Sequence, residues 1–282
     1  MTDTVIEVEN LVKEFGSGRH ASRVLDEVGF TVNRGETVGL VGESGSGKST
    51  TARCILRLIE PTSGVIRFEG EDVLSFGRRK IKEYRARAQM VFQDPYSSLD
   101  PRMCVEDIIA EGIQIHRPKE KRAKVRDEIA ELLELVGLRP DHLPRRPAAF
   151  SGGERQRIGI ARALAVRPSL LICDEPVASL DVSIQAQILN LFVDLKSRLG
   201  LTMIYIAHDL ATVRHLCDRI VVMQGGKIKE IGSREQIYGA PHDPYTIALM
   251  QAVPEPDPML ARERSAQRRL AAATAAKSGA AT

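Results

Sequence analysis

The chain has 282 residues, 43% of them hydrophobic and 27% charged, which is typical of a globular protein that folds around its own core. Its net charge of +3 is too small to indicate nucleic acid as a partner, and we expect none. No apolar stretch reaches the roughly 18 residues of a membrane-spanning helix, and residues 1–5 lack the basic and apolar regions of a signal peptide. We therefore expect the protein to stay in the cytosol.

The N-terminal part is predicted to be rich in β-strands. Apolar and polar residues alternate over 5–9 and again over 65–69, after a turn at 61–64. A short apolar strand at 38–41 runs directly into a glycine-rich loop. Earlier in the chain, Phe15 could stack on a nucleotide base, as aromatic side chains do in proteins that bind single strands. A core phenylalanine at a strand end is the alternative.

The glycine-rich loop fits the pattern G-x-x-x-x-G-K-[ST] and lies between a strand and a helical segment at 50–58, the context that a phosphate-binding loop requires. Its glycines let backbone N–H groups curl around phosphate, Lys48 supplies a charge to the β- and γ-phosphates, and Ser49 supplies a hydroxyl to Mg²⁺. A plain glycine–serine turn would explain neither the lysine nor this setting. The predicted nucleotide-binding residues of the loop are Gly42, Glu43, Ser44, Gly45, Ser46, Gly47, Lys48, Ser49 and Thr50.

From about Asp94 to Arg167 the pattern becomes helical. One apolar face has residues at helical spacing, namely Val125, Ile129, Leu132, Leu133 and Val136. A helical insert inside an α/β core suggests two lobes. Gln93 lies at the junction, where its amide could report the state of Mg²⁺ or the γ-phosphate to the insert. Most glutamines, however, are surface residues.

The stretch Phe150–Arg157 opens a helix within this region. Ser151 and Glu154 have the spacing of a capping box, which begins ordinary helices. Gly152 and Gly153, however, each destabilise a helix by about 1 kcal/mol relative to alanine. Paired glycines expose backbone N–H groups at the positive end of the helix dipole, which favours an anion there. Taken alone, the stretch fits both a plain cap and an anion site.

Three candidate residues follow buried strands. Asp174 ends the strand that begins at 170 and can hold Mg²⁺ beside the phosphate loop. Glu175 comes next, placed to polarise water for attack on the γ-phosphate. Two solvated acids are the alternative. His208 directly follows the predicted strand 203–207 and could touch the γ-phosphate or hold the attacking water, or it could be a structural group.

Strands and helices alternate in the C-terminal half. An apolar helix face is predicted over 184–199 and a further strand over 220–223. Continuous apolar strands separated by helices indicate a parallel sheet covered on both faces. After Pro254 the chain is rich in proline, alanine and arginine, and residues 271–282 have no periodicity, which is typical of a disordered tail.

Together these motifs resemble the ATP-binding subunit of an ABC transporter, in family order and over about residues 5–235. The family motifs fall on the following residues: Walker A at 42–49, the Q-loop at Gln93, the signature at 151–154, Walker B at 170–174, the catalytic glutamate at Glu175, the D-loop at Ser179–Asp181, the switch histidine at His208 and the adenine-stacking aromatic at Phe15.

The resemblance implies ATP and Mg²⁺ as cofactors and assigns each site residue a role. The implied catalytic residues are Glu175, His208 and Gln93. The implied metal ligands are Ser49, Gln93 and Asp174. The residues implied to bind nucleotide are Phe15, the loop residues 42–50, Ser151, Gly152, Gly153, Glu154 and Asp181.

The family also implies an α/β fold of the P-loop NTPase class, which has a RecA-like core with a mostly parallel sheet, an N-terminal antiparallel β subdomain and an inserted α-helical subdomain. We expect the ABC ATPase domain over 1–240, with the helical insert at about 94–167. A C-terminal extension with a disordered tail is expected over 241–282.

Family members pair head to tail, so that Walker A of one ATPase subunit and the signature of the other hold each ATP. The implied partners are a second ABC ATPase subunit, identical or paralogous, and two transmembrane permease subunits. An extracytoplasmic solute-binding protein is implied through the complex. The expected place of the chain is the cytoplasmic face of the cell membrane.

Two segments resemble a narrower branch of importers, for oligopeptides, dipeptides and nickel. These segments are Phe92–Met103 and His242–Pro258. They favour ATP-driven uptake of peptides or a similar small solute. The alternatives are an exporter ATPase and a soluble ABC ATPase that acts on nucleic acid or ribosomes. Proteins of the latter class usually carry two cassettes, long coiled coils or zinc-binding cysteines.

The chain departs from the family pattern in two places. Its signature reads FSGGE where LSGGQ is usual, which still keeps Ser151, Gly152 and Gly153. Many relatives also have a cysteine-containing tail that can hold an iron–sulfur cluster, but no cysteine follows Cys217 here. The four cysteines are widely spaced, which predicts reduced, mostly buried thiols and no cluster.

Overall fold

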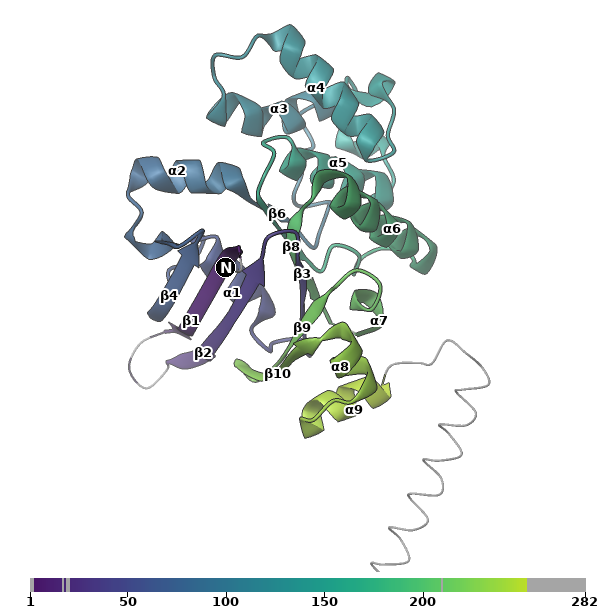
Figure 1. The fold of residues 1–282 in the computed structure, drawn as a ribbon. Coiled ribbons are helices and arrows are strands. Elements are labelled where there is room, and N and C mark those ends of the chain that lie inside the picture. The colour runs from purple at the N-terminus through teal and green to yellow at the C-terminus, as the bar shows by residue number, and fades with distance from the viewer. Residues whose placement is uncertain (1–2, 17, 19–20, 209, 253–282) are drawn as a thin grey trace, which may run out of the picture.

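The computed structural model describes residues 3–16, 18, 21–208 and 210–252; the predicted tail at 253–282 lies outside them. The described part contains two sheets flanked by helices (Figure 1). The first sheet is antiparallel, with the strand order β2-β1-β4-β5. Its strands are β1 (Thr4–Phe15), β2 (Ser22–Asn33), β4 (Ser63–Phe68) and β5 (Glu71–Asp72).

The second sheet has the order β10-β9-β3-β8-β7-β6 and is parallel except where β10 pairs with β9. Its strands are β3 (Thr37–Val41), β6 (Ala88–Val91), β7 (Leu170–Asp174), β8 (Thr202–Ala207), β9 (Arg219–Gln224) and β10 (Lys227–Ser233). The predicted α/β class is confirmed, with an antiparallel N-terminal sheet and a mostly parallel core sheet.

Parallel pairing aligns the carboxyl ends of four core strands at one edge of the sheet. Val41 at the end of β3 pairs with Ala207 at the end of β8. Cys173 in β7 pairs with Tyr205 in β8 and with Val91 at the end of β6. All residues of β3, β7 and β8 are buried, as expected for parallel strands covered on both faces. The segments that leave these strands therefore start side by side.

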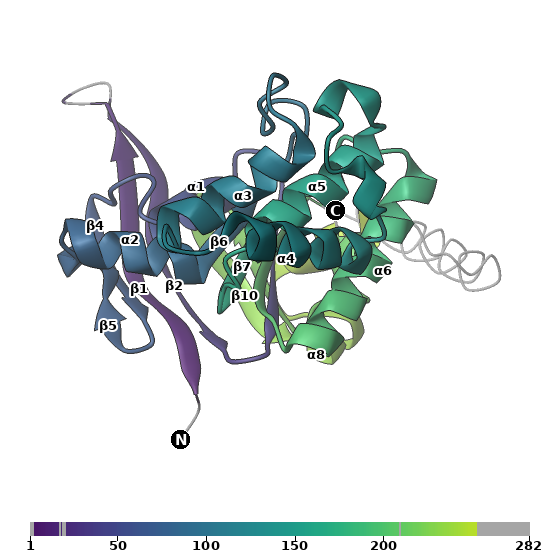
Figure 2. The same cartoon turned by 90° about the horizontal axis from the view of Figure 1, so that it is seen from above.

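Helices cover the core sheet and form the second lobe. The α-helices are α1 (Lys48–Ile55), α2 (Arg78–Arg87), α3 (Val105–His116), α4 (Arg122–Leu135), α5 (Gly152–Leu164), α6 (Val182–Leu199), α7 (Leu210–Val213), α8 (Arg234–Gly239) and α9 (Pro244–Ala252). Short 3₁₀ turns span Val73–Ser75, Pro140–His142 and Pro147–Ala149. Helices α3, α4 and α5 contact one another, and Figure 2 shows the antiparallel sheet on one side of the molecule and α5 and α6 on the other.

Three elements differ most from the predictions. Helix α2 lies in the part expected to be β-rich, and it has no apolar stripe that a sequence pattern could show, because Tyr84 is its one buried residue. Strand β1 extends well beyond residues 5–9. The alternation did not show its full length, because register shifts in its pairing with β2 interrupt the pattern. The helix expected over 50–58 spans Lys48–Ile55.

The antiparallel sheet shares a core with the parallel sheet, and Ile66 of β4 is fully buried in it. Ile66→Ala should lower the free energy of unfolding by roughly 2–5 kcal/mol, because deleting a buried branched side chain leaves a cavity. Val182→Ala is the matched control, since Val182 is 82% exposed. Chemical denaturation should show the loss for Ile66→Ala alone; equal midpoints would contradict this packing.

Candidate functional site

The phosphate loop between β3 and α1 needs glycine at two close approaches. Gly42 has φ 151°, and a Cβ there would lie 2.1 Å from the Met223 carbonyl oxygen. Gly47 has φ 102°, and a Cβ there would lie 2.7 Å from Cδ2 of Leu25. Strands β9 and β2 thus press against the loop from outside. The loop's exposed tip comprises Glu43, Ser44 and Gly45, and Thr50 lies in the first turn of α1.

Lys48 places its ammonium group inside this loop. The side chain is 4% exposed, and Nζ donates to the carbonyl oxygens of Gly42 at 2.7 Å and Glu43 at 2.9 Å. Burial lowers the pKa of Lys48, while the negative charges of Glu175 and Asp174 act in the opposite direction. A buried ammonium held by carbonyl groups can exchange them for the oxygens of a phosphate.

Asp174 and Ser49 meet across the site. Ser49 Oγ donates to Asp174 Oδ1 at 2.7 Å, although the two residues come from α1 and β7. Burial raises the pKa of Asp174, opposed by the Ser49 hydrogen bond and by the charges of Arg53 and Lys48. A carboxylate and a hydroxyl are hard oxygen ligands of the kind that Mg²⁺ prefers. The pair therefore fits a magnesium ion shared with phosphate.

Glu175 turns out of the sheet immediately after Asp174. Its φ of 45° is left-handed, and its N–H donates to the Ile206 carbonyl oxygen at 3.1 Å. Its carboxylate accepts from Gln93 Nε2 at 3.3 Å and lies 3.9 Å from Lys48 Nζ. The structure thus brings Glu175, Gln93 and Lys48 together. His208 directly follows β8, which the sheet register places beside β3 and β7.

The signature stretch lies elsewhere, at the start of α5. The predicted capping box is present, with Ser151 and Glu154 each accepting from the other's backbone N–H. A Cβ on Gly153 would lie 2.5 Å from Ile184 Cγ2, and one on Gly152 would lie 3.3 Å from Leu180 Cδ2. Close packing is therefore a second reason for these glycines. Among the described residues, no hydrogen bond links Ser151–Glu154 to the phosphate loop.

A connection between α5 and the segment after β6 was not foreseen. The Arg155 guanidinium lies 4.2 Å from the centre of the Tyr96 ring. Gln156 Nε2 donates to the Phe92 carbonyl oxygen at 3.4 Å, and Arg162 donates to that of Ser98. No sequence spacing marks such contacts, because they join segments about 60 residues apart. They fasten the signature helix to the segment that carries Gln93.

Phe15 and Asp181 lie at the margins of the site. Phe15 ends β1 and is 43% exposed, so the alternative of a core phenylalanine is wrong. Its role in stacking stays a prediction. Asp181 is exposed at the start of α6, where its carbonyl oxygen accepts from the N–H groups of Ile184 and Gln185.

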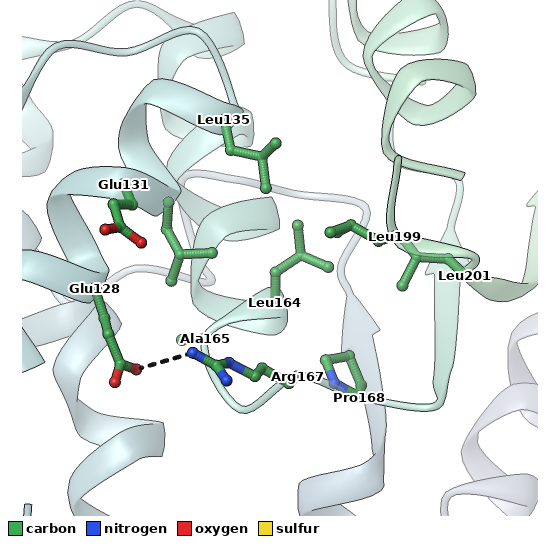
Figure 3. A pocket seen from close by; sticks show the side chains of 10 residues that line it. Glu128, Glu131, Leu135, Leu164, Ala165, Arg167, Pro168, Leu199 and Leu201 are labelled. Carbon is green, nitrogen blue, oxygen red and sulfur yellow. Dashed lines mark ion pairs between the residues drawn. The ribbon is translucent and has the colours of Figure 1, made fainter. Parts of the chain in front are cut away.

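Two hollows flank the junction between the helical lobe and the core. One, of about 510 Å³, lies between α4, the end of α5 and the end of α6 (Figure 3). It has leucine walls, and the Glu128–Arg167 ion pair of 3.8 Å lies at its rim. The other, of about 660 Å³, lies between β6, α3 and α5, and its lining includes Phe92, Ile115 and Arg162.

Comparison with known proteins agrees with this geometry. A family model for the ABC transporter matches residues 25–178. A second, for the C-terminal region of the oligopeptide/dipeptide transporter, matches residues 229–280. The chain belongs to the oligopeptide/dipeptide family of ABC transporter ATP-binding proteins.

Individual relatives match nearly the whole chain. The oligopeptide transport ATP-binding protein OppF of Bacillus subtilis is 49% identical over 269 residues, which are 95% of this chain and 88% of that protein. The dipeptide transport ATP-binding protein DppF of Lactococcus lactis subsp. cremoris is 49% identical over 264 residues, 93% of this chain and 85% of that protein.

Solved structures confirm the fold class of an ABC ATPase. A dimeric post-hydrolysis structure of the ATP-binding cassette MJ0796, bound to ADP and Pi, matches with a TM-score of 0.74 and 26% identity. The match covers 81% of this chain and 98% of that one. For cbiO1 from Clostridium perfringens, the TM-score is 0.74 at 28% identity, covering 84% and 92%. Within the described residues, no helix has the length and hydropathy to span a bilayer.

Asp174→Asn should raise the melting temperature of the protein without nucleotide or Mg²⁺ at neutral pH. Burial raises the pKa of Asp174 in the folded state. The contribution of its carboxyl group to stability is therefore present below the ordinary carboxyl pKa and is lost as pH rises through the folded-state pKa. The asparagine removes the buried charge and keeps an oxygen for Ser49. The difference in melting temperature between variant and wild type should therefore become smaller at acid pH.

Differential scanning calorimetry across pH measures this difference. Asp181→Asn is the control, because Asp181 is exposed, and it should leave the melting temperature nearly unchanged. A lower neutral-pH melting temperature for Asp174→Asn would contradict the proposed burial of charge.

Proposed function

We propose that this chain hydrolyses ATP to drive peptide uptake, as a peripheral subunit at the cytoplasmic face of the membrane. The observation that carries the proposal is the convergence of Lys48, the Ser49–Asp174 pair and the Gln93–Glu175 pair at one sheet edge. The relatives named for oligopeptide and dipeptide transport support peptides as the cargo class.

The phosphates of ATP would lie in the loop 42–50, with the adenine stacked on Phe15. The Lys48 ammonium already occupies the centre of the loop and would move its hydrogen bonds from carbonyl groups to the β- and γ-phosphate oxygens. Bound Mg²⁺ would supply charge that neutralises the phosphates. Ser49, Asp174 and Gln93 would hold it.

Glu175 would act as the general base on the attacking water. Its carboxylate lies at the carboxyl end of β7, within hydrogen-bonding distance of Gln93 and near Lys48. His208, at the end of β8, would contact the γ-phosphate. The Gln93 hydrogen bond would also hold the Glu175 carboxylate in place until nucleotide arrives.

The signature would serve a nucleotide on a second ATPase subunit. Ser151 and the N–H groups of Gly152 and Gly153 present an anion site, with Glu154 completing the cap. The start of α5 packs near Leu180. The phosphate loop of the same chain already holds the Lys48 ammonium, which would bind that chain's own nucleotide. Asp181, exposed nearby, would lie at the contact between subunits. The dimeric cassette among the similar structures supports this pairing.

The hollow beside β6 would receive a permease subunit. With two ATPase subunits in the complex, each would bind one of the two permeases. Phe92 and Ile115 line the hollow and are large exposed apolar residues, 42% and 48% exposed. The hollow borders the segment that carries Gln93. A movement of this segment on nucleotide binding would therefore reach the bound permease. A solute-binding protein would join through the permeases.

The domain limits also stay proposals: an ATPase domain over 1–240 with its insert at about 94–167, and an extension over 241–282. The family match for the C-terminal region begins at residue 229, within β10, and so overlaps the proposed ATPase domain. The portion of the extension beyond residue 252 lies outside the described residues.

Lys48→Ala should weaken the binding of ATP by roughly 10–100-fold, the loss expected when a charged hydrogen-bonding group is removed. Calorimetric titration with ATP measures the affinity. Lys80→Ala is the control, because Lys80 lies exposed on α2 and pairs with Glu71. Normal ATP affinity in Lys48→Ala would refute the proposed site.

Glu175→Gln should reduce steady-state ATP hydrolysis by the assembled transporter roughly 10²–10⁴-fold, the usual contribution of a general base. ATP binding should persist because the amide keeps the shape of the side chain. Glu83→Gln is the matched control, because Glu83 lies exposed on α2 and pairs with Arg79. An unchanged hydrolysis rate in Glu175→Gln would exclude Glu175 as the base.

Ile115→Glu should prevent the chain from co-purifying with its permeases, because it replaces an exposed apolar side chain of the hollow by a charged one. Titration should still give normal ATP affinity. Val193→Glu is the control, since Val193 is also an exposed apolar residue but lies on α6. Recovery of a complete complex with Ile115→Glu would place the permease contact elsewhere.

A further inference from the structure

One peptide group of the phosphate loop is held from both ends. The carbonyl oxygen of Gly42 accepts from Lys48 Nζ at 2.7 Å. The N–H of the same peptide group, on Glu43, donates to the Tyr245 hydroxyl at 3.2 Å. Because the two ends of a trans peptide group point in opposite directions, Tyr245 and Lys48 face each other across it. The orientation of this peptide plane sets where the Lys48 ammonium is held.

Tyr245 comes from the C-terminal region, not from the nucleotide-binding core motifs. It lies in the first turn of α9, where its N–H donates to Asp243 Oδ1 at 2.8 Å. Its ring packs against the larger core cluster. The hydroxyl reaches beyond this packing to the loop, so its removal leaves the packed ring in place.

The segment before α9 is anchored by a buried carboxylate. Glu230 on β10 is 9% exposed and accepts from the N–H groups of His242 at 2.9 Å and Asp243 at 3.1 Å. Burial acts to raise the pKa of Glu230, but these hydrogen bonds, together with interactions with Thr246 and the His242 side chain, outweigh it and lower the pKa. Strand β10 pairs with β9, and the turn between them also touches the loop, since Gly226 N–H donates to the Ser46 carbonyl oxygen at 3.1 Å.

We propose that Tyr245 is a positioning residue for Lys48, which ties the family's C-terminal region to nucleotide binding. Its hydroxyl fixes the Gly42–Glu43 peptide plane, and with it the position of the Gly42 carbonyl oxygen, which holds the ammonium in the loop until phosphate replaces it. The ammonium is thereby held where phosphate arrives. Tyr245 touches backbone and not the reacting atoms, so it acts on affinity and not on the hydrolysis step. The inference rests on the proposed ATP site.

Tyr245→Phe in the full chain tests this role. Calorimetric titration with Mg-ATP should show a dissociation constant raised about two- to tenfold, the effect of one neutral hydrogen bond. In the assembled transporter, KM for ATP should rise by a similar factor while kcat stays unchanged. Tyr238→Phe is the matched control: it removes a hydroxyl in α8 that donates to the Leu210 carbonyl oxygen, and should leave the affinity for ATP unchanged.

A second variant changes Glu230, the carboxylate that anchors the segment before α9. Glu230→Gln should weaken ATP binding in the same direction, since an amide offers one oxygen to two N–H donors. Combined with Tyr245→Phe it should add little further loss, because both act through the same hydroxyl.

The inference is overturned if Tyr245→Phe binds Mg-ATP as tightly as wild type, or more tightly, while Lys48→Ala has lost affinity. A fall in kcat with unchanged KM would overturn it as well. If Lys48→Ala also binds normally, the proposed ATP site itself fails, which separates the two claims.

Discussion

Parallel hydrogen bonding among β3, β8, β7 and β6 is the constraint on which the site depends. The register fixes the ends of these strands at one edge, and every proposed group of the reacting centre ends one of them or follows one of them. The Ser49–Asp174 hydrogen bond then ties the start of α1 to the end of β7. A shift of one strand relative to its neighbour would separate residues that lie far apart in the sequence.

The burial of the sheet explains the electrostatics of the edge. Strands that are covered on both faces bring Lys48 and Asp174 out of water, which lowers the pKa of the lysine and raises that of the aspartate. Each group keeps hydrogen-bond partners from the loop or from α1. The lysine is held by loop carbonyl groups and the aspartate by Ser49. Such a buried centre, with one cationic and one anionic group, is suited to receive a phosphate and a metal ion together.

The sequence was sufficient to predict the α/β class, the phosphate loop and the strand ends that carry Asp174 and Glu175. These features depend on local spacing and on runs of apolar residues, which a single sequence displays directly. It also predicted the capping box at Ser151, whose geometry is contained within four residues.

The sequence could not predict contacts between distant segments. The approach of Gly153 to Ile184 depends on how α5 crosses the start of α6, and the Glu43–Tyr245 hydrogen bond spans 202 residues. Helix α2 was missed because its charged residues leave one buried side chain. Such features follow from tertiary packing, which local patterns do not record.

In the proposed function the chain supplies two unlike halves of shared ATP sites, its phosphate loop to one and its signature to the other. The most direct measurement is photolabelling by azido-ATP of an assembled transporter in which a size-tagged Ser151→Arg chain is paired with an untagged wild-type ATPase subunit. We expect the tagged chain to keep its label and the untagged subunit to lose it. Loss of label from the tagged chain, with the untagged subunit still labelled, would show that each chain holds its nucleotide with its own signature.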